Sequence, residues 1–192
     1  FIKSGLLHGI EVANGADMSD EAFKIALDNK LTILGTSDIN GLIDWEYDLE
    51  HGGHRTATLV LTKDETADGL KAALKAGDTV AIYKDNLIGR KANVEAVVRG
   101  TLKMEVGEAL PKTTVQGVSI INDSPVDYML ENMGPEGAYD EGHVFTVKSG
   151  STFTLLIRNV PDPKKLSLNF KVLNTYVAPR EHLVLNLKDE TP

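Results

Sequence analysis

Cysteine is absent from this sequence of 192 residues. Disulfide bonds, thiolate zinc sites and a cysteine nucleophile are therefore excluded. Long apolar runs are absent as well, since no stretch approaches the roughly 18 residues that a membrane-spanning helix needs. The first residues, Phe1-Ile2-Lys3-Ser4-Gly5, also lack the pattern of a signal peptide. We therefore expect no membrane partner.

Positive charge is scarce relative to negative charge. Lysine and arginine number 20 against 28 aspartates and glutamates, so the formal net charge is −8. General nucleic-acid binding depends on a basic surface that releases counterions from phosphates. We expect no such binding here.

The residues that are present are typical of a globular protein. Hydrophobic residues make up 42% and charged residues 25%, which excludes disordered and low-complexity chains. The length allows one large domain or two small ones. Because the sequence begins at Phe1 rather than at Met, it is either a trimmed precursor or a piece of a longer protein, and the motifs below favour the piece.

The first half alternates between expected strands and helices. Ser19 is a typical N-cap with acidic residues after it, and Gly77 is a typical residue after a helix end. Two similar strand–helix–strand units predict a parallel sheet, although two amphipathic helices can also resemble each other without a repeat. The expected strands are 9–13, 31–35, 57–62 and 78–83, and the expected helices are 19–29 and 65–76.

From about residue 93, alternation of period two replaces the helical pattern. Six or seven short strands separated by turn residues predict a β-sandwich of immunoglobulin-like size. We place the domain boundary near 88–91, so the expected domains are residues 1–90 and 91–192. The expected strands are 101–106, 115–121, 144–147, 152–157, 166–172 and 182–187.

The segment Leu34-Gly35-Thr36-Ser37-Asp38 is the first candidate for chemistry. It places a carboxylate at the carboxyl end of an expected parallel strand, where the active sites of α/β barrels form. An aspartate in this position is also a common turn or cap residue.

Several segments together resemble the PHP family of metal-dependent phosphoesterases, and most closely its two-domain bacterial members. These segments are Gly9-Ile10-Glu11-Val12-Ala13-Asn14-Gly15, Leu34-Gly35-Thr36-Ser37-Asp38-Ile39, Gly53-His54-Arg55, Thr58-Leu59-Val60 and Leu87-Ile88-Gly89-Arg90. The resemblance implies the end portion of a distorted (β/α)7 barrel followed by a β-rich domain. The expected fold class is thus α/β plus all-β, with an immunoglobulin-like sandwich second. Bacterial cytoplasm and periplasm both stay open.

The family implies a site of two or three divalent metal ions (Zn, Mn or Fe) held by His and carboxylate ligands. Its first ligands belong to a His-x-His motif, which this sequence lacks. Its last pair, Asp-x-His, corresponds here to Asp38-Ile39-Asn40, so Asp38 and Asn40 are the expected metal positions. A neutral amide oxygen binds these metals more weakly than an imidazole does. We expect this chain to be inactive by itself, with no catalytic residue of its own and with the metal either weakly held or not bound.

The resemblance also places His54 and Arg55 near the mouth of the barrel, where they would bind the phosphate of a small phosphorylated substrate. The alternative role is a structural ion pair or hydrogen bond. His51 and His54 form a further, weaker candidate metal pair. An acidic and aromatic segment around Trp45 is expected to pack its ring on the barrel rim, with a lid or an interface as alternatives.

A second function class stays open, in which the chain is a non-catalytic binding or assembly module on a degenerate PHP scaffold. An incomplete barrel would leave an unpaired strand edge and uncovered apolar surface. We therefore expect association with the missing amino-terminal half or with a second copy.

Overall fold

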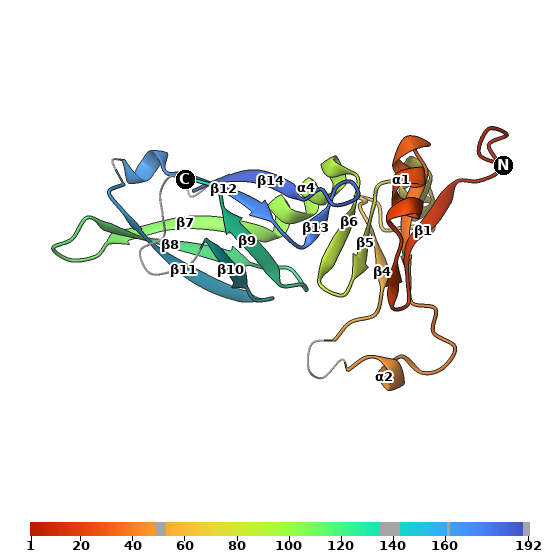
Figure 1. The fold of residues 1–192 in the computed structure, drawn as a ribbon, viewed down its shortest axis with the longest axis horizontal. Helices are drawn as coiled ribbons and strands as arrows, with labels where there is room; N and C mark the ends of the chain where they lie inside the picture. Colours follow the sequence, from red (N-terminus) through yellow and green to blue (C-terminus); the bar gives the residue numbers. More distant parts are fainter. Residues whose placement is uncertain (49–52, 135–142, 161, 190–192) are drawn as a thin grey trace. The chain divides into compact units, whose positions relative to one another are not determined.

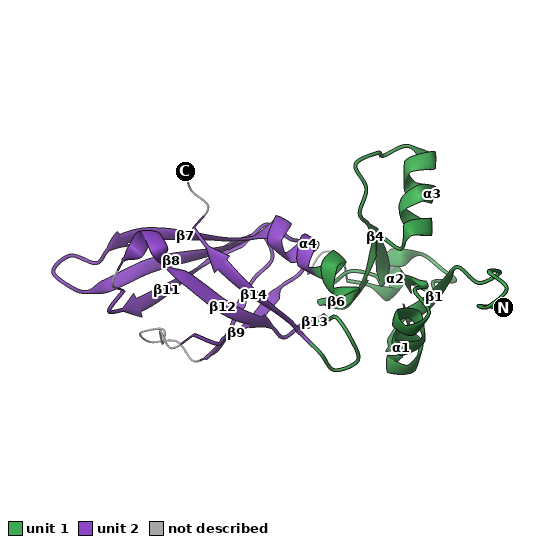
Figure 2. Cartoon of the chain, turned by 90° about the horizontal axis from the view of Figure 1, so that it is seen from above, with its two compact units in different colours: residues 1–94, 175–181 green, residues 95–174, 182–192 purple. Residues whose placement is uncertain are grey.

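A computed structural model describes residues 1–48, 53–134, 143–160 and 162–189 (Figure 1). The chain divides into two compact units (Figure 2): residues 1–94 with 175–181, and residues 95–174 with 182–192. Among the described residues, no helix has both the length and the apolar character needed to span a membrane. The expected boundary at 90/91 does not include the return of 175–181 to the first unit. That return occurs because β13 (Thr175–Tyr176) pairs in parallel with β6 (Asn86–Gly89). The sequence does not predict this strand, because two residues are too few to show a periodic pattern.

The first unit begins with a strand–helix–strand unit, as predicted. β1 (Gly9–Asn14) and β3 (Thr32–Thr36) pair in parallel, and α1 (Asp20–Asp28) connects them. The Ser19 side chain accepts a hydrogen bond from the backbone N–H of Ala22, which confirms it as the N-cap. α1 packs Phe23 and Ala26 against buried strand residues of the same core. The short strand β2 (Asp17–Met18) pairs with the end of β1.

The second expected parallel unit is wrong. β4 (Ala57–Val60) and β5 (Thr79–Tyr83) are antiparallel, although α3 (Ala67–Ala76) lies between them as predicted. The N–H of Leu61 donates to the carbonyl of Asp78 at 2.8 Å, so the chain leaves and re-enters the ladder at the same end. The helix is thus part of a long hairpin connection. Periodicity identifies a helix, but it carries no information on the direction in which the chain returns.

Threonine side chains attach β3 to the β13-β6-β5-β4 sheet in place of a regular ladder. The backbone N–H of Gly35 donates a hydrogen bond to Thr58 Oγ1 at 2.9 Å. The Thr58 hydroxyl in turn donates to the carbonyl oxygen of Gly35 at 2.8 Å. Thr79 Oγ1 donates to the carbonyl of Ile33 at 2.7 Å. These bonds hold the carboxyl end of β3 beside β4 and β5, which positions the loop that follows.

The second unit is a β-sandwich, as predicted. One sheet has the order β10-β9-β12-β14 and the other β11-β8-β7, and all neighbours within them are antiparallel. Fully buried residues of both sheets, including Ile120, Leu155, Leu130 and Phe170, fill its core. The strands are β7 (Leu102–Ala109), β8 (Val115–Asn122), β9 (Tyr128–Asn132), β10 (Val144–Val147), β11 (Ser151–Arg158), β12 (Ser167–Val172) and β14 (Leu183–Lys188), with a short 3-10 helix at Pro163–Lys165.

Besides β13 and the short 3-10 helix, two longer elements of this half were not predicted. The first is α4 (Lys91–Thr101), which crosses the division between the units. Its apolar residues Val94, Val97 and Val98 have helical spacing, but β-branched residues and Gly100 have low helix propensity. The second is β9, whose central residues alternate between buried and exposed but follow a run of turn residues.

Candidate functional site

The carboxyl ends of three strands in the first unit meet the amino end of a fourth around a hollow. The ends of β1 and β3 are paired in register. Thr56, directly before β4, donates to the Gly15 carbonyl oxygen at 2.7 Å, and the Tyr83 hydroxyl at the end of β5 donates to the Ala16 carbonyl. The hollow has a volume of about 350 Å³ and is lined by residues of the loops that follow these strand ends.

Five titratable side chains line this hollow: Asp38, Glu46, Tyr47, His54 and Lys84. The small residues between them, such as Gly15, leave the space open. Two carboxylates and one ammonium group face the same space, with an imidazole beside them. The hollow can therefore take both a cation and an anion.

Asp38 lies two residues beyond β3, where the sequence predicts it. Its φ of 51° is in the left-handed region, which aspartate tolerates better than most residues. The side chain is exposed, and within the described part of the chain its carboxylate forms no ion pair. A turn residue needs only this backbone conformation, but an open carboxylate facing a hollow also has the geometry of a ligand.

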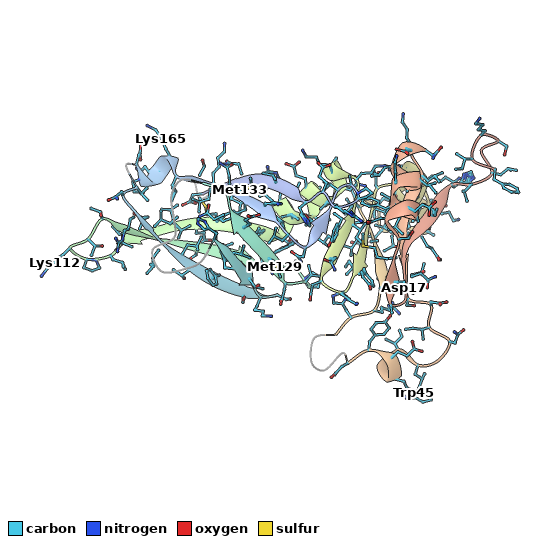
Figure 3. All side chains as sticks on the ribbon, in the orientation of Figure 1. Asp17, Trp45, Lys112, Met129, Met133 and Lys165 are labelled. Carbon is cyan, nitrogen blue, oxygen red and sulfur yellow. The ribbon has the colours of Figure 1, made fainter. Side chains whose placement is uncertain are left out.

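Asn40 is two residues further along and is exposed, but it is not among the residues that line the hollow. The loop continues into α2 (Ile43–Glu46), a single helical turn that extends away from the sheet of the unit (Figure 1). Trp45 on this turn is 79% exposed, so the expected packing of its ring on the rim is wrong. Figure 3 shows its side chain pointing outward, away from the sheet.

His54 lines the hollow, whereas Arg55 is exposed and does not. The His54 Nε2 atom lies 3.8 Å from the Asp85 carboxylate in the turn between β5 and β6. Its Nδ1 atom lies 3.4 Å from the Arg55 carbonyl oxygen. The structure thus brings His54 and Asp38 to one hollow, although 16 positions separate them in the sequence. His51 lies outside the described residues.

Lys84 is the residue of this site that sequence reasoning missed. It forms the apex of the β5–β6 hairpin with a φ of 52°, and its Nζ atom lies 4.9 Å from the centre of the Tyr83 ring. The sequence around it, Tyr83-Lys84-Asp85-Asn86, is typical of a surface turn and matches no motif. Only the position of this turn next to the end of β1 could have identified it.

The donor set does not by itself make a catalytic metal site. Among residues 1–48, 53–134, 143–160 and 162–189, no group of three or more histidines and carboxylates is placed to hold a metal ion. Catalytic zinc sites use three protein ligands, and the carboxylate of Asp38 can supply one. The residues that the structure describes therefore offer one candidate ligand, Asp38, and do not form a complete metal site.

Comparison with known proteins gives two similarities. A family model described as an Ig-like domain matches residues 102–188, which are the sandwich. The crystal structure of a two-domain protein from Bacteroides vulgatus, containing a predicted PHP-like metal-dependent phosphoesterase, matches with a TM-score of 0.83 and 31% sequence identity. That match covers 97% of this chain and 54% of the other, so the chain spans about half the length of its structural neighbour. None of the curated proteins matches the chain.

Proposed function

We propose that this chain is the carboxyl-terminal part of a PHP-like metal-dependent phosphoesterase, in which the first unit completes the hydrolase domain and the second unit is an Ig-like appendage. The hydrolysis of small phosphate esters would belong to the whole protein. The observation that carries the proposal is the hollow at the strand ends, where Asp38 presents an unpaired carboxylate in a fold similar to a predicted phosphoesterase.

Within this proposal, the loop after β3 contributes one metal ligand. Asp38 would bind a divalent ion, and Asn40 would be at most a weak neutral ligand beside it. His54 and Arg55 would contact the phosphate of the substrate, His54 from the lining of the hollow and Arg55 from its exposed neighbouring position. A His-x-His motif and the remaining ligands would lie in residues that precede this chain in a longer protein.

The open edge of β1 supports a partner on that side. On the side away from β3, β1 pairs only through Ala13 and Asn14, so Gly9–Glu11 has no neighbouring strand among the described residues. Leu6 and Leu7 lie directly before this edge and are 70% and 38% exposed. A preceding barrel strand would pair with this edge and cover these side chains. A second copy of the chain is the alternative occupant.

The experiment that tests the proposal uses a longer protein that contains this chain with the residues encoded before Phe1. We expect those residues to include His-x-His and the longer protein to hydrolyse p-nitrophenyl phosphate when Mn²⁺ or Zn²⁺ is added. The 192-residue chain should not hydrolyse it. Asp38→Ala should lower the rate by at least 10²-fold, because a ligand of the reacting centre is lost.

The matched control is Asp17→Ala, since Asp17 is also an exposed aspartate near the end of β1 but does not line the hollow (Figure 3). Its rate should equal that of the unmodified protein. Hydrolysis that is insensitive to Asp38→Ala, or a preceding sequence without His-x-His, would refute the assignment of the site.

One observation favours a second candidate function. Asn40 replaces the imidazole that the family pattern has, and no three-ligand cluster occurs in the described part of the chain. A non-catalytic binding or assembly module on the same scaffold would have this donor set. The same assay separates the two, since such a module hydrolyses nothing even in the longer protein.

A further inference from the structure

We infer that Lys84 is the residue of the hollow that binds the phosphate oxygens of the ligand. This inference deepens the proposed function and rests on it for the identity of the substrate. The first observation is the charge of the lining: Lys84 is the residue with a permanent positive charge among those that line the hollow.

The second observation is that this charge is available. Lys84 forms no ion pair with any described residue, and the contact of its Nζ atom is with the face of the Tyr83 ring. Asp38 and Glu46 line the same hollow, but neither carboxylate forms an ion pair with Lys84. An ammonium group without a carboxylate partner is a ready point charge for an anion.

The third observation is that the hairpin apex is anchored. The Tyr83 hydroxyl donates to the carbonyl of Ala16, and Asn86 Nδ2 donates to the Tyr83 carbonyl oxygen at 3.1 Å. Asp85 approaches the His54 ring at 3.8 Å on the same turn. The anchored turn therefore holds Lys84 at the hollow, which His54 also lines, with little backbone left to order when a ligand binds.

Phosphate is the anion that suits this arrangement. A compact, strongly charged group gains most from an ammonium point charge, and Ser37 also lines the same small space. Arg55, the cation that the sequence favours, is outside the lining. The structure thus assigns the phosphate contact to a turn residue that belongs to no motif.

The test is a titration of the 192-residue chain with inorganic phosphate, in the presence of a chelator and at a pH above the second pKa of phosphate. Binding is monitored through the NMR chemical shifts of the backbone amides of the residues that line the hollow. We expect millimolar binding that weakens as salt is added, because the site is open to water. Lys84→Gln should raise the dissociation constant about fivefold, as expected for an exposed charge contact. Lys84→Arg should restore most of the affinity.

Lys30→Gln is the matched control. Lys30 is exposed and lies before the amino end of β3, away from the hollow. Its φ of 56° is close to that of Lys84, so glutamine has to adopt the same left-handed backbone conformation in both variants. Its dissociation constant should equal that of the unmodified chain. Equal constants for Lys84→Gln and the unmodified chain, or phosphate shifts confined to other regions, would overturn the inference.

Asp38→Ala distinguishes this inference from the proposed function. It should abolish hydrolysis in the longer protein, yet tighten phosphate binding by this chain, because a repelling carboxylate is removed from the hollow. Phosphate binding through Lys84 without any hydrolysis by the longer protein would refute the proposed phosphoesterase function and support the phosphate site at Lys84. Hydrolysis whose rate Lys84→Gln leaves unchanged would support the phosphoesterase function and refute the phosphate site at Lys84.

Discussion

Gly35 lies in β3 where strands β4 and β5 approach closely. A Cβ atom there would lie 2.6 Å from the carbonyl oxygen of Ala57 and 3.0 Å from the Cβ of Ala81. Both neighbours are parts of strands, so neither can move without disturbing the sheet. The glycine of the Gly-Thr-Ser-Asp segment is thus explained by packing, and the loop that carries Asp38 depends on it.

We predict that Gly35→Ala lowers the free energy of unfolding of the first unit by about 1 to 3 kcal/mol, as overpacked cores do. Urea unfolding followed by circular dichroism measures it. Gly100→Ala in α4 is the control and should have the opposite effect. A Cβ atom there would meet nothing within 4 Å, and alanine has a higher helix propensity than glycine, so the free energy of unfolding should rise by about 0.5 kcal/mol. Equal midpoints for both variants would show that the close approach of β3 and β4 is unimportant.

Asp38 and Lys84, which both line the hollow, differ in how far the sequence could predict their positions. Asp38 follows an apolar strand and small residues, so its place at a strand end was predictable and is confirmed. Lys84 was not predictable, because a lysine in a tight turn has the same local pattern whether it faces solvent or a site. Its role depends on the tertiary bonds that bring Tyr83 to Ala16.

At the scale of elements, Asp127 connects two loops of the sandwich. Burial raises the pKa of its carboxyl group, but the Lys148 ammonium at 2.6 Å and the Ser149 backbone N–H at 2.9 Å outweigh it and hold the pKa below the usual value. The stability that these bonds contribute is present above the unfolded-state pKa of about 3.9 and is lost as the pH falls through the folded-state pKa.

We predict that Asp127→Asn lowers the free energy of unfolding of the second unit by about 1 kcal/mol at pH 7, since this carboxylate is partly exposed. The difference from the unmodified chain should shrink as the pH is lowered below about 4. Urea midpoints across this range measure it. Asp123→Asn, at the more exposed pair with Lys103, should have little effect. A pH-independent difference at Asp127 would mean that its charge plays no part.

The elements themselves show where sequence patterns suffice. Capping residues and apolar spacing located α1. Alternation located five strands of the sandwich within one residue at each end, and a sixth, β7, which extends three residues further than expected. The antiparallel pairing of β4 with β5 could not be predicted, because both directions bury the same apolar faces. β13 could not be predicted either, because a strand of two residues that pairs with the distant β6 leaves no periodic pattern in the sequence.

At the scale of the whole molecule, the chain combines an Ig-like sandwich with a first unit in which Gly9–Glu11 of β1 has, among the described residues, no strand on the side away from β3. It matches about half of a two-domain protein that contains a predicted PHP-like metal-dependent phosphoesterase. The hollow is lined by the carboxylates of Asp38 and Glu46, but no group of three or more possible metal ligands occurs among the described residues. Under the proposed function the metal site would be composite, with Asp38 supplying one ligand and other residues of a longer protein supplying the rest.

Metal content after exhaustive dialysis tests this central claim most directly. The longer protein should retain at least one Zn²⁺ or Mn²⁺ ion per chain, its Asp38→Ala variant should retain less, and the 192-residue chain should retain none. Full metal retention by the 192-residue chain, or by the Asp38→Ala variant of the longer protein, would contradict a composite site built around Asp38.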